Sequence, residues 1–77
     1  MQPVLQLANE EDLKSASAHL ATQGYPSKVL SFSDLRPDDY ADWMKPDEGG
    51  YVLCIPHDEK YEAAMTCLGL FFGYSES

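Results

Sequence analysis

A thiol, an imidazole and two carboxylates fall close together in the stretch CIPHDE, residues 54–59. Cysteine, histidine and aspartate are common zinc ligands, and a Cys–His pair can also support nucleophilic catalysis. A metal site needs three or four converging ligands, and the chain offers no second pair such as CxxC or HxxxH. Catalysis needs an exposed, activated thiolate, whereas Cys54 lies within an apolar run. We therefore expect no metal site, no catalytic residue and no cofactor here.

The same stretch has a structural explanation as the junction between a strand and a helix. Tyr51–Ile55 has the composition of a strand, and Pro56 ends it. Asp58 is a suitable N-cap for a helix, and Glu59 suits the positive end of the helix dipole. Gly69 is the expected C-cap. The apolar face of this helix would comprise Tyr61, Ala64, Met65 and Leu68.

The first part of the chain repeats this arrangement. Val4–Ala8 reads as a strand, and Asn9 caps a helix with an acidic first turn that ends at Gly24. Lys28–Phe32 reads as a second strand, and Leu70–Tyr74 is apolar enough for a last one. The order β-α-β, acidic insertion, β-α-β predicts an α+β ferredoxin-like sandwich, with two helices on one face of a mainly antiparallel sheet. The length predicts a single domain over residues 1–77.

Composition narrows the kinds of partner. Thirteen acidic against five basic residues give a net charge of −8, which should repel nucleic acid and anionic membranes and leaves basic partners open. The apolar runs are too short for a membrane span, and no secretory signal is evident at the N-terminus. Two cysteines, Cys54 and Cys67, are too few for a disulfide framework. These features predict a cytoplasmic protein with buried, reduced thiols.

The acidic insertion, residues 33–50, contains large aromatic and apolar side chains that have either a structural or a functional explanation. Pro37 can start a short helical turn within it. Two explanations of its large side chains stay open. They can fold back over an open face of the sheet, which a small core favours, or they can anchor a partner within an acidic rim. The candidate partner-binding residues are Tyr40, Trp43, Met44, Asp38, Asp39 and Asp42.

Two segments, LQLANEEDLKSASAHLATQGYPSKVLS and GYVLCIPHDEKYEAAMTCLG, resemble small prokaryotic domains described as signal-transducing proteins, of PII-like or ferredoxin-like fold. The layout is also similar to the cytosolic N-terminal domain of bacterial rhomboid proteases. The family pattern is V-x-V-P-x-x-D/E-x-x-x-A at a strand-to-helix turn. The residues that match it are Val52, Cys54, Ile55, Pro56, Asp58 or Glu59, and Ala63 or Ala64. The resemblance implies a regulatory or interaction module without catalytic residues.

These features together predict a non-catalytic regulatory or protein-interaction module of the bacterial cytoplasm. The alternative is an acidic inhibitor, of the kind some phages encode, that mimics nucleic acid and occupies a basic binding site. A sheet of about four short strands also has two open edges, which predicts a homodimer formed through an edge strand or an uncovered sheet face.

Overall fold

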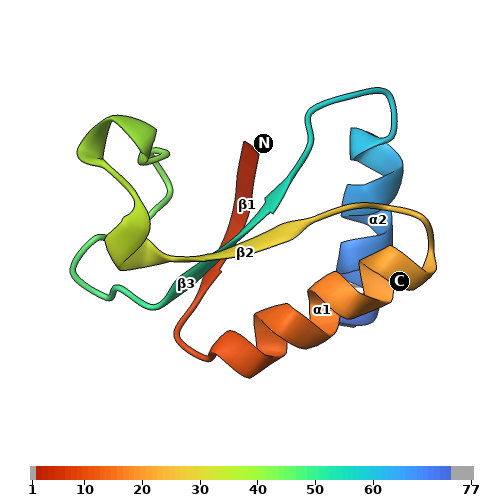
Figure 1. The fold of residues 1–77 in the computed structure, drawn as a ribbon, viewed down its shortest axis with the longest axis horizontal. Coiled ribbons are helices and arrows are strands. Elements are labelled where there is room, and N and C mark those ends of the chain that lie inside the picture. Colours follow the sequence, from red (N-terminus) through yellow and green to blue (C-terminus); the bar gives the residue numbers. More distant parts are fainter. Residues whose placement is uncertain (1, 74–77) are drawn as a thin grey trace.

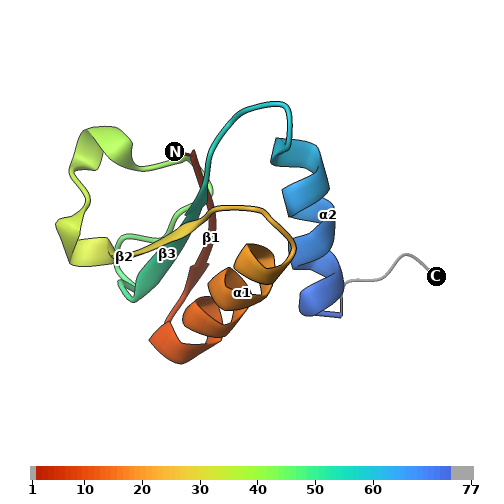
Figure 2. The same ribbon diagram turned by 45° about the vertical axis from the view of Figure 1, so that its right-hand side comes forward.

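The computed structural model describes residues 2–73 and contains a sheet with a different layer on each side. Two helices cover one side of the sheet, and an irregular segment covers the other (Figures 1 and 2). In chain order the elements are β1 (Gln2–Leu7), α1 (Glu10–Thr22), β2 (Lys28–Ser31), the short 3-10 helices η1 (Phe32–Asp34) and η2 (Pro37–Asp39), β3 (Tyr51–Ile55) and α2 (Tyr61–Phe71).

The sheet has three strands in the order β1-β3-β2, and β3 pairs antiparallel with both neighbours. β1 and β2 are therefore parallel to each other and flank the later strand, with α1 connecting them across the sheet (Figure 1). The expected α+β class, with two helices and an antiparallel sheet, is confirmed. Register shifts between Pro3 and Leu5, so Val4 forms an irregularity in the β1 ladder.

The predicted strand at Leu70–Tyr74 is wrong for the residues that the structure describes. Leu70 and Phe71 form the last residues of α2, and Tyr74 lies outside the described range. The helix continues because Phe72 follows Ala64 and Leu68 at four-residue spacing and packs against the same core. A strand would direct neighbouring side chains to opposite faces and would break this row.

The predicted cap at Gly69 is wrong for the same reason, since this glycine lies inside the helix. The helix ends at Phe71, and Phe72 is its C-cap. Gly73 follows with φ +80°, the left-handed conformation that glycine adopts at low cost.

The first helix forms as predicted. The Asn9 side chain accepts a hydrogen bond from the Glu11 backbone N–H at 2.9 Å, which satisfies one free donor of the first turn. Leu13, Ala16 and Leu20 lie on one face and are fully buried. At the other end Gly24 has φ +84°, and the following chain turns back to the sheet.

The central strand is buried on both faces, which divides the core into two clusters. Leu53 and Ile55 face the helices and pack with the buried residues of α1 and α2. Val52 and Cys54 face the opposite side and pack beneath the segment between β2 and β3. The continuous apolar run in β3 therefore reflects cover on both faces. Within residues 2–73, neither helix has the length and apolar character needed to cross a bilayer.

Candidate functional site

The CIPHDE stretch runs from the core to the surface, and its polar side chains diverge. Cys54 is buried in β3, whereas His57 is exposed and its ring packs on Tyr61, with centroids 4.8 Å apart. The Asp58 carboxylate accepts a hydrogen bond from the Lys60 backbone N–H at 2.9 Å and closes a turn. Helix α2 begins only at Tyr61, so the prediction of Asp58 as its N-cap is wrong by two residues.

The surroundings of Cys54 oppose ionisation. Burial raises the pKa of the Cys54 thiol above its ordinary value, and nearby positive charge, including that of Lys28, lowers it only in part. The thiol is therefore neutral near pH 7, the form with little nucleophilic reactivity. Among residues 2–73, no three His, Cys, Asp or Glu residues form a group that could hold a metal ion.

The segment between β2 and β3, residues 32–50, is hereafter the excursion. It lies on the sheet face opposite the helices (Figure 2). Phe32 and Met44 are buried against β3, and the rings of Phe32 and Tyr40 pack with centroids 4.8 Å apart. The Ala41 backbone N–H also contacts the Met44 sulfur at 3.3 Å. The excursion is thus a cover for the second cluster, with its own apolar underside.

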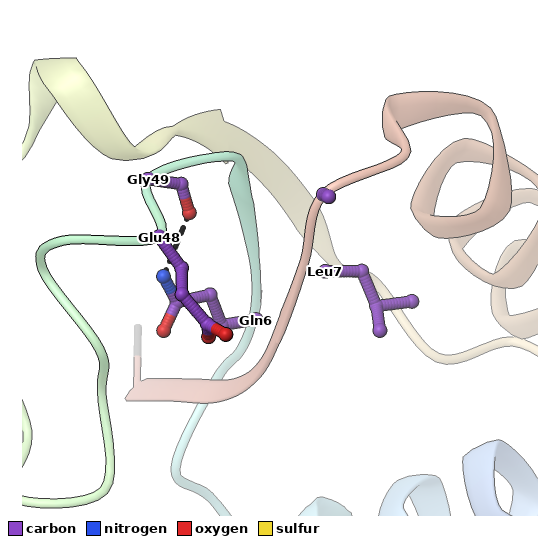
Figure 3. A pocket seen from close by; sticks show the side chains of 5 residues that line it. Gln6, Leu7, Glu48 and Gly49 are labelled. Atoms are coloured by element: carbon purple, nitrogen blue, oxygen red, sulfur yellow. Dashed lines mark hydrogen bonds between the residues drawn. The ribbon is translucent and has the colours of Figure 1, made fainter.

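Gln6 attaches the returning arm of the excursion to β1 through its side-chain amide. Its Nε2 donates to the Lys45 carbonyl at 3.0 Å and to the Gly49 carbonyl at 2.7 Å, and its Oε1 accepts from the Lys45 N–H at 2.8 Å. Figure 3 shows Gln6 reaching toward Gly49 beside the Glu48 side chain. The sequence carries a signal for this role, because Gln6 is the polar interruption within the otherwise apolar run of residues 4–8.

Gly50 holds the end of the excursion against the junction that follows β1. Its φ is +82°, and a Cβ placed on it would lie 2.5 Å from the Leu7 carbonyl oxygen. Its own carbonyl accepts the Phe32 backbone N–H at 2.9 Å. Only glycine fits this close approach without moving the backbone. Gln6 and Gly50 therefore anchor the returning arm at neighbouring points.

The structure separates the predicted partner-binding residues into two sets. Tyr40 is half-buried and Met44 is only 6% exposed, so both form part of the excursion's packed underside. Trp43 is 46% exposed. It lines a hollow of about 190 Å³ beside the edge strand, together with Val4, Leu5, Gln6, Lys45 and Glu48. Sequence reasoning missed the contribution of β1 to this hollow.

The predicted aspartates, Asp38, Asp39 and Asp42, are all exposed on the excursion. Asp39 accepts a hydrogen bond from the Arg36 backbone N–H at 3.4 Å, which caps η2. Within the part of the chain that the structure describes, the excursion's acidic side chains form no ion pair. Their charge is therefore uncompensated at short range and faces solvent.

Comparison of the chain with protein-family models, with curated proteins and with solved structures finds no match. What the protein does is therefore inferred from its own residues and their arrangement.

Proposed function

We propose that this protein is a non-catalytic interaction module that binds a protein partner through the excursion, with Trp43 as the central contact. One observation carries the proposal: Trp43 is 46% exposed, while Met44 beside it is buried in the second cluster. A small core gains from burying every large aromatic side chain. Tryptophan is also the residue type most enriched among the dominant contacts of protein interfaces.

The excursion is attached in a way that suits a binding surface. Met44 packs on the sheet and Lys45 is held by Gln6, so the residues that follow Trp43 are positioned before any partner arrives. A preorganised contact loses less conformational entropy on binding than a free loop does. We therefore assign Tyr40 and Met44 the role of holding the excursion in place, and Trp43 the role of touching the partner.

The three aspartates would act on the rate of encounter. Asp38, Asp39 and Asp42 are exposed, and the −8 net charge of the chain favours a partner with a basic surface. Charges at the rim of an interface mainly accelerate association and contribute less to the lifetime of the complex. Neutralising the three aspartates should therefore slow association and flatten its salt dependence.

The acidic inhibitor that mimics nucleic acid is the less favoured candidate. Within residues 2–73 the acidic residues are spread over the excursion, the start of α1 and the turn that leads into α2 together with its first turn, which lie on different sides of the molecule (Figure 1). A mimic needs its charges gathered along one surface, as they are on nucleic acid. The dispersed arrangement supports the interaction module.

We also propose that the fold is ferredoxin-like. Two parallel strands joined by a helix, with a third strand between them, are the split β-α-β arrangement found in ferredoxin-like domains. This supports a ferredoxin-like fold, and the resemblance to the prokaryotic signal-transducing domains is the basis for proposing a regulatory role in the bacterial cytoplasm. A fourth strand, expected of that fold, is not part of residues 2–73.

The test compares three tagged proteins as baits in host extract: the natural sequence, Trp43→Ala and Leu70→Ala. Leu70 is a matched control, because it is 64% exposed and lies on α2, on the opposite side of the sheet. We expect a partner retained by the natural sequence and by Leu70→Ala but lost with Trp43→Ala. With the purified partner, loss of the indole should weaken binding by about 2 kcal/mol or more, roughly 30-fold in Kd. Equal retention by all three baits would contradict the proposal.

A further inference from the structure

The outer edge of β1 is open in the part of the chain that the structure describes. β1 is the first strand in the order β1-β3-β2, so within residues 2–73 it pairs on one side only. An edge strand presents a row of backbone N–H and C=O groups that can pair with another extended segment. Proteins often recognise peptides by adding them as a strand to such an edge.

β1 is better suited to accept a strand than β2, the other edge. β2 has only four residues, starts at the exposed Lys28 and follows Pro26 closely, and both residue types discourage edge pairing. β1 has six residues and no charged side chain. Pro3 and the irregularity at Val4 interrupt its first half. The second half, Leu5–Leu7, is the regular part of the edge.

The hollow at Trp43 lies against β1 from Val4 to Gln6 and so overlaps this regular part of the strand. Its lining combines strand residues, among them Leu5 and Gln6, with Trp43 and Glu48 of the excursion. At about 190 Å³ it is smaller than the roughly 300 Å³ of a typical small-molecule pocket. Its size and position suit one side chain of a segment lying along β1.

Charge indicates which kind of segment fits. Between residues 33 and 50 the chain has six acidic and two basic residues, so this part carries −4 of the total −8. A second copy of the chain would bring the same negative charge to the edge. A basic side chain would instead find the Trp43 ring and the Glu48 carboxylate in the same hollow, although Lys45 opposes it in part. Arginine gains from both contacts, through cation–π stacking and a charge-assisted hydrogen bond.

We infer that the partner contributes an extended, arginine-containing segment, which adds as a strand to the outer edge of β1 at Leu5–Leu7 and places an arginine over Trp43. The inference rests on the proposed function and specifies how the same site binds. It assigns the backbone of β1 a role in affinity, and the Trp43–Glu48 pair a role in selecting the basic side chain.

The test uses three synthetic decapeptides with the purified protein. The first alternates Arg and Thr, the second has the same sequence with every backbone amide N-methylated, and the third has Glu in place of Arg. N-methylation removes the N–H donors that a strand needs and keeps the charge. We expect the first peptide to bind at least about tenfold more tightly than the second, since several ladder hydrogen bonds are lost. The Glu peptide should not bind. Hydrogen exchange should slow at alternate amides within Leu5–Leu7 only with the first peptide.

Equal affinity of the first two peptides would overturn strand addition, and so would failure of the first peptide to bind at millimolar concentration. Binding of the Glu peptide would overturn the choice of a basic partner. A dimer in sedimentation, together with slow hydrogen exchange at Leu5–Leu7 in the absence of peptide, would overturn the arginine segment in favour of a second copy. A different result would contradict the proposed function itself: retention by Trp43→Ala of every partner that the natural sequence captures from host extract.

Discussion

The side-chain amide of Gln6 bonds both backbone polar groups of Lys45, although the two residues are 39 positions apart. Oε1 accepts the Lys45 N–H at 2.8 Å, and Nε2 donates to the Lys45 carbonyl at 3.0 Å. This reciprocal pair resembles one rung of a β-ladder, with a side chain in place of the second strand. It holds the excursion on the sheet at a point where the backbone forms no strand of its own.

Gln6→Ala should loosen the excursion more than it disturbs the helices. The variant loses three hydrogen bonds, two to Lys45 and one to Gly49, for an expected cost of about 2 kcal/mol in the free energy of unfolding. Urea unfolding gives this cost, and hydrogen exchange should accelerate at Lys45 before it does in α1. Gln2→Ala is the control, because among the described residues the Gln2 side chain makes a single hydrogen bond, an exposed one of 3.4 Å to the Tyr61 hydroxyl. Equal effects of the two variants would contradict the assigned role of Gln6.

The two adjacent glycines should respond very differently to alanine. Both have positive φ, +64° at Gly49 and +82° at Gly50, but a Cβ on Gly49 meets no atom within 4 Å. Gly49→Ala should therefore cost about 1 kcal/mol for the left-handed backbone alone. Gly50→Ala adds a clash with the Leu7 carbonyl oxygen and should cost about 2–5 kcal/mol in total. Thermal unfolding of the pair measures the difference, and a similar Tm for both variants would show that the junction can relax.

Alanine substitution should affect mainly stability at Met44 and mainly partner binding at Trp43. Met44 is 6% exposed in the second cluster, so Met44→Ala should destabilise the fold by about 2–5 kcal/mol. Trp43 is 46% exposed, and Trp43→Ala should cost less than about 1 kcal/mol while it abolishes partner capture. Chemical denaturation of both variants provides the comparison. A loss at Trp43 as large as that at Met44 would identify the indole as part of the core and remove the basis of the proposed function.

Cys54 should make the fold less stable at alkaline pH. Burial raises the pKa of its thiol in the folded state, so on raising the pH the unfolded chain releases its proton first. The unfolded state then binds fewer protons, and stability falls as pH rises above roughly 8.5, the ordinary thiol pKa. Cys54→Ala should show a smaller drop between pH 7 and pH 10 in reducing buffer.

Cys67→Ala is the control for this experiment, because Cys67 is free and half-buried and lies on α2. Its variant should keep the alkaline drop of the natural sequence. Under native conditions a polar thiol reagent should label Cys67 before Cys54. Identical pH dependence in all three proteins, or faster labelling of Cys54, would contradict the burial assigned to that thiol.

Gly69→Ala should stabilise the protein. Gly69 lies within α2, and a Cβ added there meets no atom within 4 Å. Alanine removes the entropic cost of glycine in a helix, for an expected gain of about 0.5–1 kcal/mol. Gly73→Ala is the opposite case, because its φ of +80° should make the change destabilising by about 1 kcal/mol. A Tm that does not rise with Gly69→Ala would contradict the extension of the helix through Phe71.

Local chemistry was enough to predict α1 and β3 from the sequence. Asn9 caps α1 through its own side chain, and the apolar spacing of Leu13, Ala16 and Leu20 already marks the buried face. Tyr51–Ile55 is bounded by Gly50 and Pro56, and its unbroken apolar run indicates cover on both faces. The end of α2 could not be read in this way, because the run after Gly69 suits a strand or a helix equally well locally. Packing of Phe72 beside Leu68 decided for the helix.

The candidate site shows the same division between local and tertiary information. The sequence by itself determined that a short helical turn begins at Pro37, that the segment is acidic and that it carries one tryptophan. Only the tertiary structure decided that Met44 turns inward, that Trp43 stays half-exposed and that β1 supplies the other wall of its hollow. The physical reason is that burial in the excursion depends on contacts across the sheet. Gln6 sets those contacts from a position 39 residues before Lys45, and Gly50 does so through a positive φ and a close approach to Leu7. Neither feature forms a periodic pattern in the sequence.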